Sequence, residues 1–175
     1  MTDLVAPVSD RDHIQGSKAV PTTVVEYGDY QCPKCAVGHQ IIQSIQQQLG
    51  ARLCFVFRHF PRTKLHPYAQ HAAEATEAAA RQGRFWEMHD CLFSRQSTFD
   101  NGTLVECADA IGLDIPQFLR ELAADVHVNR VQEDVDSGIK SGVQETPTFF
   151  INGCRYDNAC ERSLLLAAIA QSALP

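Results

Sequence analysis

Long hydrophobic runs are missing from this sequence of 175 residues. The longest apolar stretches, at 148–151 and 164–169, are far shorter than the roughly 20 residues that a membrane-spanning helix needs. A secretory signal is missing as well, because residues 1–20 contain neither a basic start nor an apolar stretch of about 7 to 15 residues. We therefore expect a soluble, cytoplasmic protein without a membrane partner.

An excess of basic residues is also missing. Lys and Arg total 15 against 21 Asp and Glu, which gives a net charge of -6, and no basic stripe alternates with aromatic residues. These features exclude nucleic acid as an expected partner. The sequence has no internal repeat and no low-complexity linker, and its 45% hydrophobic content is enough for one core. We predict a single domain that spans residues 1–175.

Cysteine, in contrast, is abundant, with seven residues. Because the cytoplasm keeps most thiols reduced, we do not interpret this set as a disulfide framework. Cys54, Cys91 and Cys107 fall inside apolar strand or helix patterns, where a free cysteine behaves as a small hydrophobic residue. We predict that these three are inert core thiols. The cysteines that remain to be explained are Cys32, Cys35, Cys154 and Cys160.

The first third of the chain predicts a strand, a helix and a second, parallel strand. The segments 22–27 and 53–57 are short, apolar and largely β-branched or aromatic, which is typical of strands buried on both faces. Between them, apolar residues recur at helical spacing, with Pro33 in the first turn and Gly50 at the end. A parallel pair of this kind forms the centre of an α/β sheet.

The rest of the chain predicts a helical block followed by a hairpin. The block runs from about residue 64 to 143, and its expected helices are 67–81, 85–95, 104–111, 116–124 and 129–140. Strands 148–151 and 154–156 follow, joined by a turn at Asn152-Gly153. A last helix is expected at 161–172.

The motif that carries chemistry is Cys32-Pro33-Lys34-Cys35 at the start of the first helix. The unpaired N–H groups and the positive dipole end of a helix stabilise a thiolate, which makes Cys32 the attacking sulfur. Its sulfur should be exposed, whereas Cys35 should be shielded and should resolve the mixed disulfide that Cys32 forms. The alternative is half of a zinc site, but no second pair of cysteines or histidines has matching spacing. We therefore expect no metal.

Two further positions agree with redox chemistry. Glu26 interrupts a strand that otherwise has the pattern of a fully buried strand. A buried carboxyl with a raised pKa is suited to move a proton, although an edge glutamate on the surface is the alternative. Thr146-Pro147 stands just before a core strand, where proline fits only at the first residue. A cis peptide bond is an option at such a position.

Four segments resemble the DsbA-like thioredoxin-fold proteins of bacteria. They are VVEYGDYQCPKC, FRHFP, GRFWEMHD and ETPTFFINGCRYD, and the resemblance covers roughly residues 21–174. It implies a thioredoxin fold with an all-helical insertion between the βαβ and ββα halves, and a cis peptide bond at Thr146-Pro147 that faces the cysteine pair. It also implies that Thr146 and Pro147, with Pro33 and Lys34, contact substrate, and that Glu26 is the buried acid.

The resemblance implies a thiol:disulfide oxidoreductase that acts on protein thiols and disulfides. By this resemblance the enzyme needs no cofactor beyond the Cys32–Cys35 disulfide, but it needs a reductant or oxidant as recycling partner. DsbA is periplasmic, so the expected cytoplasmic location favours reductase or isomerase work over net oxidation. Cys154 and Cys160 depart from the family pattern and are candidates for a second disulfide. The alternative functions are a glutathione-dependent transferase or isomerase, and a non-catalytic peptide-binding or chaperone module.

Overall fold

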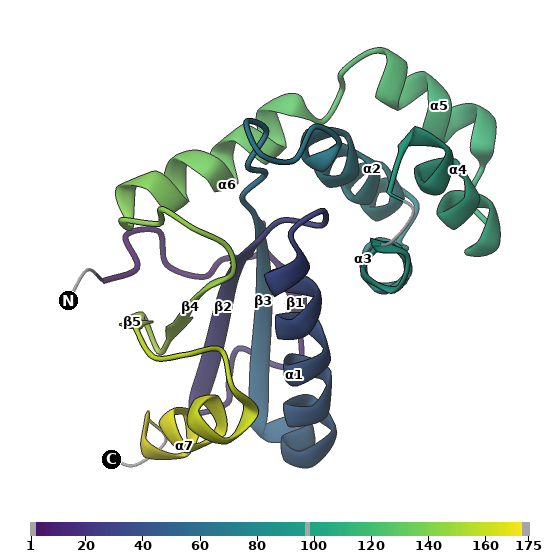
Figure 1. Cartoon of the computed structure of the whole chain (residues 1–175). Helices are drawn as coiled ribbons and strands as arrows, with labels where there is room; N and C mark the ends of the chain where they lie inside the picture. Colours follow the sequence, from purple (N-terminus) through teal and green to yellow (C-terminus); the bar gives the residue numbers. More distant parts are fainter. Residues whose placement is uncertain (1–2, 97–98, 173–175) are drawn as a thin grey trace.

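Within residues 3–96 and 99–172, which this computed structural model describes, five strands form one mixed sheet (Figure 1). The strand order is β1-β3-β2-β4-β5. The strands are β1 (His13–Gln15), β2 (Thr22–Gly28), β3 (Leu53–His59), β4 (Thr148–Ile151) and β5 (Cys154–Tyr156). β2 and β3 are parallel, and β4 and β5 form the expected antiparallel hairpin, with positive φ angles at Asn152 and Gly153. The predicted α/β arrangement is confirmed.

β3 is longer than predicted, because polar side chains at its end have buried partners. β3 continues through Arg58 and His59, both of which are buried. The Arg58 guanidinium binds Asp12 at 2.7 Å, and His59 Nε2 lies 2.9 Å from the Glu77 carboxylate. Since a paired polar group can be buried at little cost, the strand does not end where its apolar residues end.

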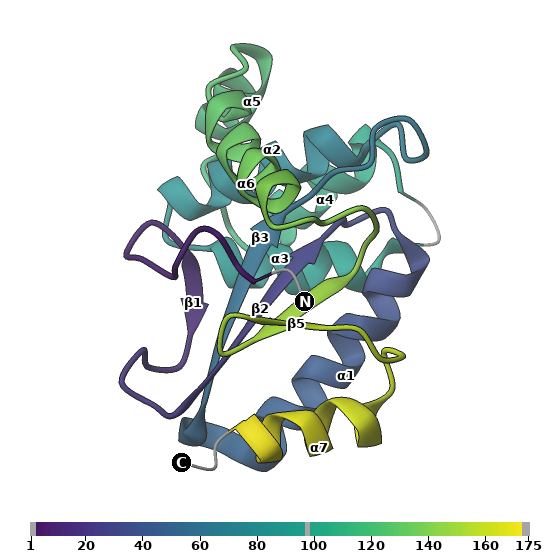
Figure 2. The same cartoon turned by 90° about the vertical axis from the view of Figure 1, so that its left-hand side faces the viewer.

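The N-terminal segment, residues 3–15, supplies a strand that the sequence did not predict. β1 pairs antiparallel with β3, so that His13 lies opposite Phe57. At the other end of the segment, the Leu4 N–H donates to the Gly153 carbonyl at 2.8 Å, and Asp3 forms a β-bridge with Cys154. The N-terminal segment therefore adds the outer strand β1 beside β3 and also touches β5, at the opposite edge of the sheet (Figure 2).

Two helices and part of the helical block cover one face of the sheet. α1 (Pro33–Leu49) and α7 (Arg162–Ser172) pack on this face, and α7 lies near the end of the sheet that is far from the start of α1 (Figure 1). Alternate residues of β2 separate the two faces. Val24 belongs to the core beneath the helices, whereas Val25 belongs to a smaller core beneath the N-terminal segment.

The predicted helical block is confirmed between β3 and β4. Its helices are α2 (Ala69–Arg81), α3 (Phe85–Ser94), α4 (Asn101–Ala110), α5 (Ile115–Ala123) and α6 (Val128–Lys140). They gather at the end of the sheet where β2 leads into α1 (Figure 1). α4 begins three residues earlier than predicted, because Asp100 and Thr103 form a capping box at its N-terminus.

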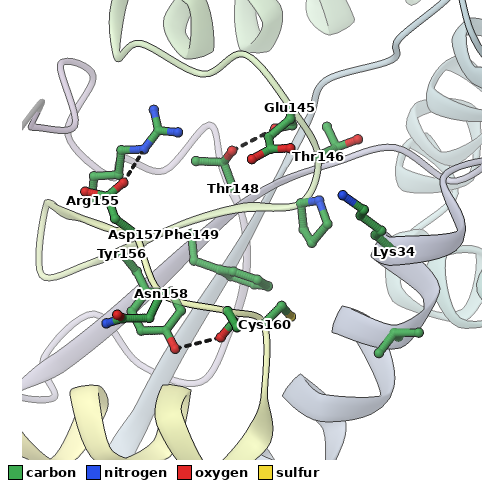
Figure 3. A pocket seen from close by; sticks show the side chains of 13 residues that line it. Lys34, Glu145, Thr146, Thr148, Phe149, Arg155, Tyr156, Asp157, Asn158 and Cys160 are labelled. Carbon is green, nitrogen blue, oxygen red and sulfur yellow. Dashed lines mark hydrogen bonds and ion pairs between the residues drawn. The ribbon is translucent and has the colours of Figure 1, made fainter.

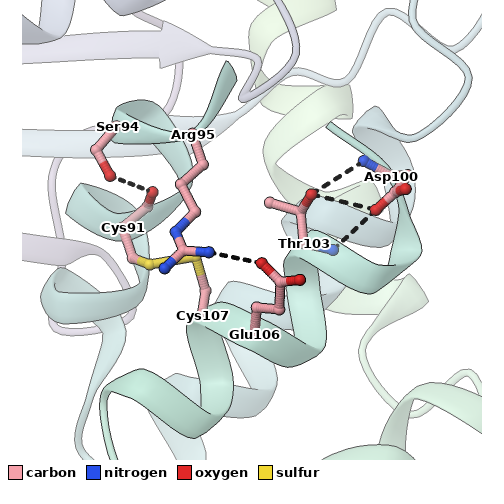
Figure 4. The surroundings of a disulfide bond; sticks show 7 residues. All are labelled: Cys91, Ser94, Arg95, Asp100, Thr103, Glu106 and Cys107. Carbon is pink, nitrogen blue, oxygen red and sulfur yellow. Dashed lines mark hydrogen bonds and ion pairs between the residues drawn. A yellow bond between two sulfur atoms is a disulfide. The ribbon is translucent and has the colours of Figure 1, made fainter. Parts of the chain in front are cut away.

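The prediction that Cys91 and Cys107 are free thiols is wrong. They form a disulfide that joins α3 to α4 (Figure 4). Each cysteine lies in a helical pattern, which indicates burial but not which helix packs opposite. Packing of α3 on α4 brings the two Cα atoms to 5.8 Å, within the range that a disulfide spans. The third predicted core thiol, Cys54, is free and fully buried, as expected.

Candidate active site

Cys32 and Cys35 lie at the N-terminus of α1, where the sequence predicted them. Cys32 is the N-cap residue in an extended conformation, and Pro33 is the first helical residue. The Cys35 N–H donates to the Cys32 carbonyl at 3.0 Å, which closes the first turn around the motif. Pro33 and Lys34 lie between the cysteines and are exposed.

The expectation that the Cys32 sulfur is exposed is wrong. Cys32 is 5% exposed and Cys35 is 0% exposed. Two segments that are distant in the sequence cover Cys32. When protonated, the Cys32 thiol donates to the Thr146 carbonyl at 3.4 Å, and the Gln96 side-chain amide donates to the Cys32 carbonyl at 2.9 Å. Helix position alone leaves the sulfur open, whereas the tertiary fold closes over it.

The loop before β4 faces the cysteine pair, as the resemblance implied. The Thr146–Pro147 peptide bond is cis. Thr146 is buried, and its hydroxyl has no hydrogen-bond partner. Its carbonyl accepts the bond from Cys32 described above, so this loop holds polar backbone and side-chain groups beside the reactive sulfur.

The two sulfurs have opposite electrostatic environments. The hydrogen bond from the Cys35 thiol, helped by backbone N–H groups of Lys34 and Cys35, outweighs burial and lowers the pKa of Cys32 from 9.0 to about 5. Burial, the hydrogen bond to Cys32 and the charge of Glu26 raise the pKa of Cys35 well above its usual value. At neutral pH the pair therefore holds one thiolate, on Cys32, and one thiol, on Cys35.

Glu26 lies in β2 and is 1% exposed, so the prediction of a buried carboxyl is confirmed. One of its carboxyl oxygens, Oε1, has no hydrogen-bond partner. Burial, and then the negative charge of Cys32, raise the pKa of Glu26 from 4.5 to about 8. A carboxyl with this pKa exchanges its proton near neutral pH.

Sequence reasoning missed the role of Asp29 in holding the loop before Cys32. The Asp29 N–H donates to the Cys35 sulfur at 3.4 Å. The Asp29 carboxylate is buried and accepts from the N–H groups of Gln31 and Arg62, both at 2.8 Å, and lies 2.7 Å from His66 Nδ1. The partners at 62 and 66 come from a loop after β3, so no local spacing in the sequence pointed to this arrangement.

Cys154 and Cys160 are free, so the candidate second disulfide is wrong. Cys154 is exposed on β5, and Cys160 lies beyond the hairpin. Cys160 lines a cavity of about 430 Å³ that also contains Lys34, Thr146 and Pro147 (Figure 3). Burial, and then the charge of Glu26, raise the pKa of Cys160 to about 11. The walls of this cavity therefore include both the loop before β4 and a third thiol, which is protonated.

Residues 9–171 match the sequence profile of a family described as thioredoxin. The chain belongs to the thioredoxin family. Solved structures agree: BdbD from Bacillus subtilis has a TM-score of 0.85 at 25% identity and covers 95% of each chain. α-DsbA1 from Wolbachia pipientis has a TM-score of 0.81 at 19% identity and covers 97% of this chain and 94% of its own. The thioredoxin fold and the resemblance to DsbA-like proteins are confirmed.

The curated relatives of this thioredoxin-family chain are named as Na(+)/H(+) antiporters. The chain is 42% identical over 171 residues to Na(+)/H(+) antiporter NhaA 1 of Salinispora arenicola. This match covers 97% of the present chain but only 26% of the relative. NhaA 1 of a Mycobacterium species is 39% identical, and that match covers 95% of the present chain and 28% of the relative. The chain therefore spans about a quarter of the curated relatives that it matches. Among the described residues, no helix is long and apolar enough to cross a membrane.

Proposed function

We propose that the chain is a thiol:disulfide oxidoreductase that acts on protein substrates through Cys32 and Cys35. The observation that carries the proposal is the lowered pKa of Cys32, about 5, on a sulfur that faces the Thr146–Pro147 loop. The thioredoxin family and fold support thiol–disulfide exchange in general. Among the described residues, the groups close enough to hold a metal ion include neither Cys32 nor Cys35, which gives no support to a zinc clip.

In the proposed reaction, the Cys32 thiolate attacks one sulfur of a substrate disulfide. A bond forms between Cys32 and that sulfur, and the other substrate sulfur leaves as a thiolate. Cys35 then loses its proton and attacks Cys32, which forms the Cys32–Cys35 disulfide and releases the second substrate thiolate. The substrate gains two electrons, which the cysteine pair loses. A dithiol reductant then returns the pair to its reduced form.

Glu26 is the proposed acceptor of the Cys35 proton. Its charge acts on both cysteines, and its pKa of about 8 leaves part of the carboxyl ionised at neutral pH. We expect Glu26→Gln to slow release of the mixed disulfide and to leave the first attack by Cys32 nearly unchanged. Stopped-flow measurement of both steps separates them, and equal slowing of attack and release would contradict this role.

We assign substrate contact to Thr146, Pro147, Pro33 and Lys34. Three of them line the cavity of about 430 Å³ beside Cys32, and its other walls include both charged and aromatic side chains. The exposed position of Pro33 and Lys34 supports contact with a chain that lies across the start of α1. A substrate segment in this place would put its disulfide next to Cys32.

The direction of exchange is a further part of the proposal. A Cys32 pKa of about 5 lies between the values of about 7 for thioredoxin and about 3.5 for DsbA, which supports an intermediate reduction potential. In the cytoplasm such a pair is mostly reduced, so we propose reductase or isomerase work there. The Cys91–Cys107 disulfide is more typical of an oxidising compartment, and measuring its redox state in cells tests the location.

Reduction of insulin by dithiothreitol tests the proposal. The wild type should accelerate the reaction, Cys32→Ser should not, and Cys154→Ser, which removes an exposed cysteine outside the pair, should be as active as the wild type. Iodoacetamide should label Cys32 with a midpoint near pH 5. Activity that survives in Cys32→Ser would favour the chaperone alternative, and glutathione conjugation that needs Cys32 but not Cys35 would favour the transferase.

The names of the curated relatives suggest a partner. Because the chain matches only about a quarter of each relative, we assign no ion transport to it. We propose instead that the cysteine pair acts on a Na(+)/H(+) antiporter. Cys35→Ser should trap the antiporter as a mixed disulfide that reductant releases. If mass spectrometry of the trapped species finds no antiporter peptide in cells that express one, this partner is wrong.

A further inference from the structure

A second cluster of reactive side chains lies between α1 and α3 and includes neither cysteine of the pair. It consists of His39 on α1 and His89 and Asp90 on α3. One potential ligand atom from each residue lies within 4.8 Å of the other two. His39 and Asp90 also line a cavity of about 420 Å³, so an ion from solvent can reach them.

The distances in this cluster suit a metal ion better than a direct ion pair. His39 Nε2 and Asp90 Oδ1 are 3.3 Å apart, and the rings of His39 and His89 have centroids 5.0 Å apart. Ligand atoms that lie about 2.0 to 2.1 Å from a tetrahedral Zn²⁺ are separated by about 3.3 to 3.4 Å. His39 and Asp90 therefore already have the spacing of two zinc ligands.

Among the residues that the structure describes, no Lys or Arg forms an ion pair with Asp90. The Gln43 side-chain amide donates to Asp90 Oδ1 at 3.4 Å, which is a long hydrogen bond. Glu87, which lies three residues earlier on α3, is a further carboxylate that acts on Asp90. A divalent cation would supply the missing positive charge.

His89 has a partner of the kind that orients metal-binding histidines. Its Nδ1 lies 3.0 Å from the Tyr30 hydroxyl. In the tautomer in which Nδ1 donates to Tyr30, Nε2 keeps a free lone pair for a metal. Tyr30 precedes Cys32 by two residues, and its carbonyl accepts from Gln96, so this contact also joins the cluster to the loop before the cysteine pair.

The protein contains another group of two histidines and a carboxylate, but it is already saturated. His13 and His59 lie 2.7 and 2.9 Å from the same oxygen of Glu77. Arg130 Nε is 3.9 Å from that oxygen, so a metal ion there would meet a positive charge. In the part of the chain that the structure describes, the cluster between α1 and α3 has no neighbouring arginine of this kind, and its His39–Asp90 contact is longer, at 3.3 Å.

We propose that His39, His89 and Asp90 bind one divalent transition-metal ion of the zinc class, with water at the remaining position. Two imidazoles and one carboxylate are a ligand set that Zn²⁺ and Co²⁺ favour. The ion would tie the helix that carries the cysteine pair to the helical block. This role is independent of thiol–disulfide exchange.

Titration with Co²⁺ followed by Zn²⁺ tests the proposal. The double variant Cys32→Ser/Cys35→Ser is the parent protein for all measurements, because serine hydroxyls at the reactive pair are poor metal ligands. We expect one Co²⁺ per chain, visible d–d absorption without a sulfur charge-transfer band, and loss of the absorption when Zn²⁺ is added. His39→Ala and Asp90→Asn should each weaken binding at least tenfold, whereas His71→Ala, on α2, should not.

Three outcomes of the titration would overturn the site: no Co²⁺ binding by the parent, a sulfur charge-transfer band, or equal binding by the parent and Asp90→Asn. The Asp90 side chain is 50% exposed, so this variant should fold. Thermal unfolding gives a second readout, since added Zn²⁺ should raise the melting temperature of the parent but not of Asp90→Asn. An equal rise in both proteins would place the ion elsewhere.

Discussion

Replacing Glu26 with glutamine should remove a pH-dependent loss of stability. The pKa of Glu26 is raised from 4.5 to about 8 in the folded protein. A group whose pKa is higher in the folded than in the unfolded protein contributes stability that is fully present below the unfolded pKa. This contribution is lost as the pH rises through the folded pKa. The window therefore runs from about pH 4.5 to pH 8. Glutamine does not ionise and should show no such loss.

The size of the effect follows from the shift. At about 1.4 kcal/mol per pKa unit, and with Glu26 half ionised at pH 8, the wild type should lose about 4 kcal/mol relative to Glu26→Gln between pH 4.5 and pH 8. Any constant cost of burying the amide is the same at both pH values and cancels. Burial causes most of the shift and the Cys32 charge the rest, so the loss should be smaller when the Cys32–Cys35 disulfide removes that charge.

Urea unfolding of the reduced and oxidised proteins, followed by circular dichroism at pH 4.5, 6 and 8, measures these differences. Glu161→Gln, at an exposed carboxylate, is the matched control and should keep the pH profile of the wild type. A difference between wild type and Glu26→Gln that changes by less than about 1 kcal/mol over this range would refute the reasoning. A loss that is unchanged by oxidation would show that the Cys32 charge does not reach Glu26.

The remaining predictions concern helix packing and the disulfide. Gly38→Ala should stabilise α1 by about 0.5 to 1 kcal/mol, because its new Cβ would have only ordinary contacts at 3.4 Å or more; destabilisation in urea would contradict this. Gly138→Ala should destabilise the fold, because its Cβ would lie 2.8 Å from the Phe60 ring; an equal or higher urea midpoint would be the contrary result. The double variant Cys91→Ala/Cys107→Ala should lose about 3 kcal/mol of unfolding free energy in urea, since the disulfide closes a loop of 16 residues, and an unchanged urea midpoint would contradict this.

The central fold could be predicted because its signals are local. The β-branched residues of β2 and the helical spacing in α1 each depend on a few neighbouring residues. β1 could not be predicted in this way. Its three residues are only partly buried, and they form a strand because β3 lies beside them and the Asp12–Arg58 ion pair holds the segment there.

The same distinction applies to the sites. The motif predicted Cys32 and Cys35, and a single charge in an apolar strand pointed to Glu26. The coverage of Cys32 by Gln96 depends on contacts across 64 residues, which no spacing rule detects. The spacing rules also gave no reason to pair Cys91 with Cys107, because each helix shows its own periodicity but not its neighbour.

The N-terminal segment has a consequence for how copies of the protein meet each other. An open sheet edge offers unpaired N–H and C=O groups on which another chain can add a strand, and such addition leads to aggregation. Here residues 13–15 pair with β3, and Asp3 and Leu4 bond to the β5 hairpin. One segment without any redox chemistry thus covers the free side of β3 and part of the edge at β5, and its detachment would turn the cysteine-bearing core into a template for self-association.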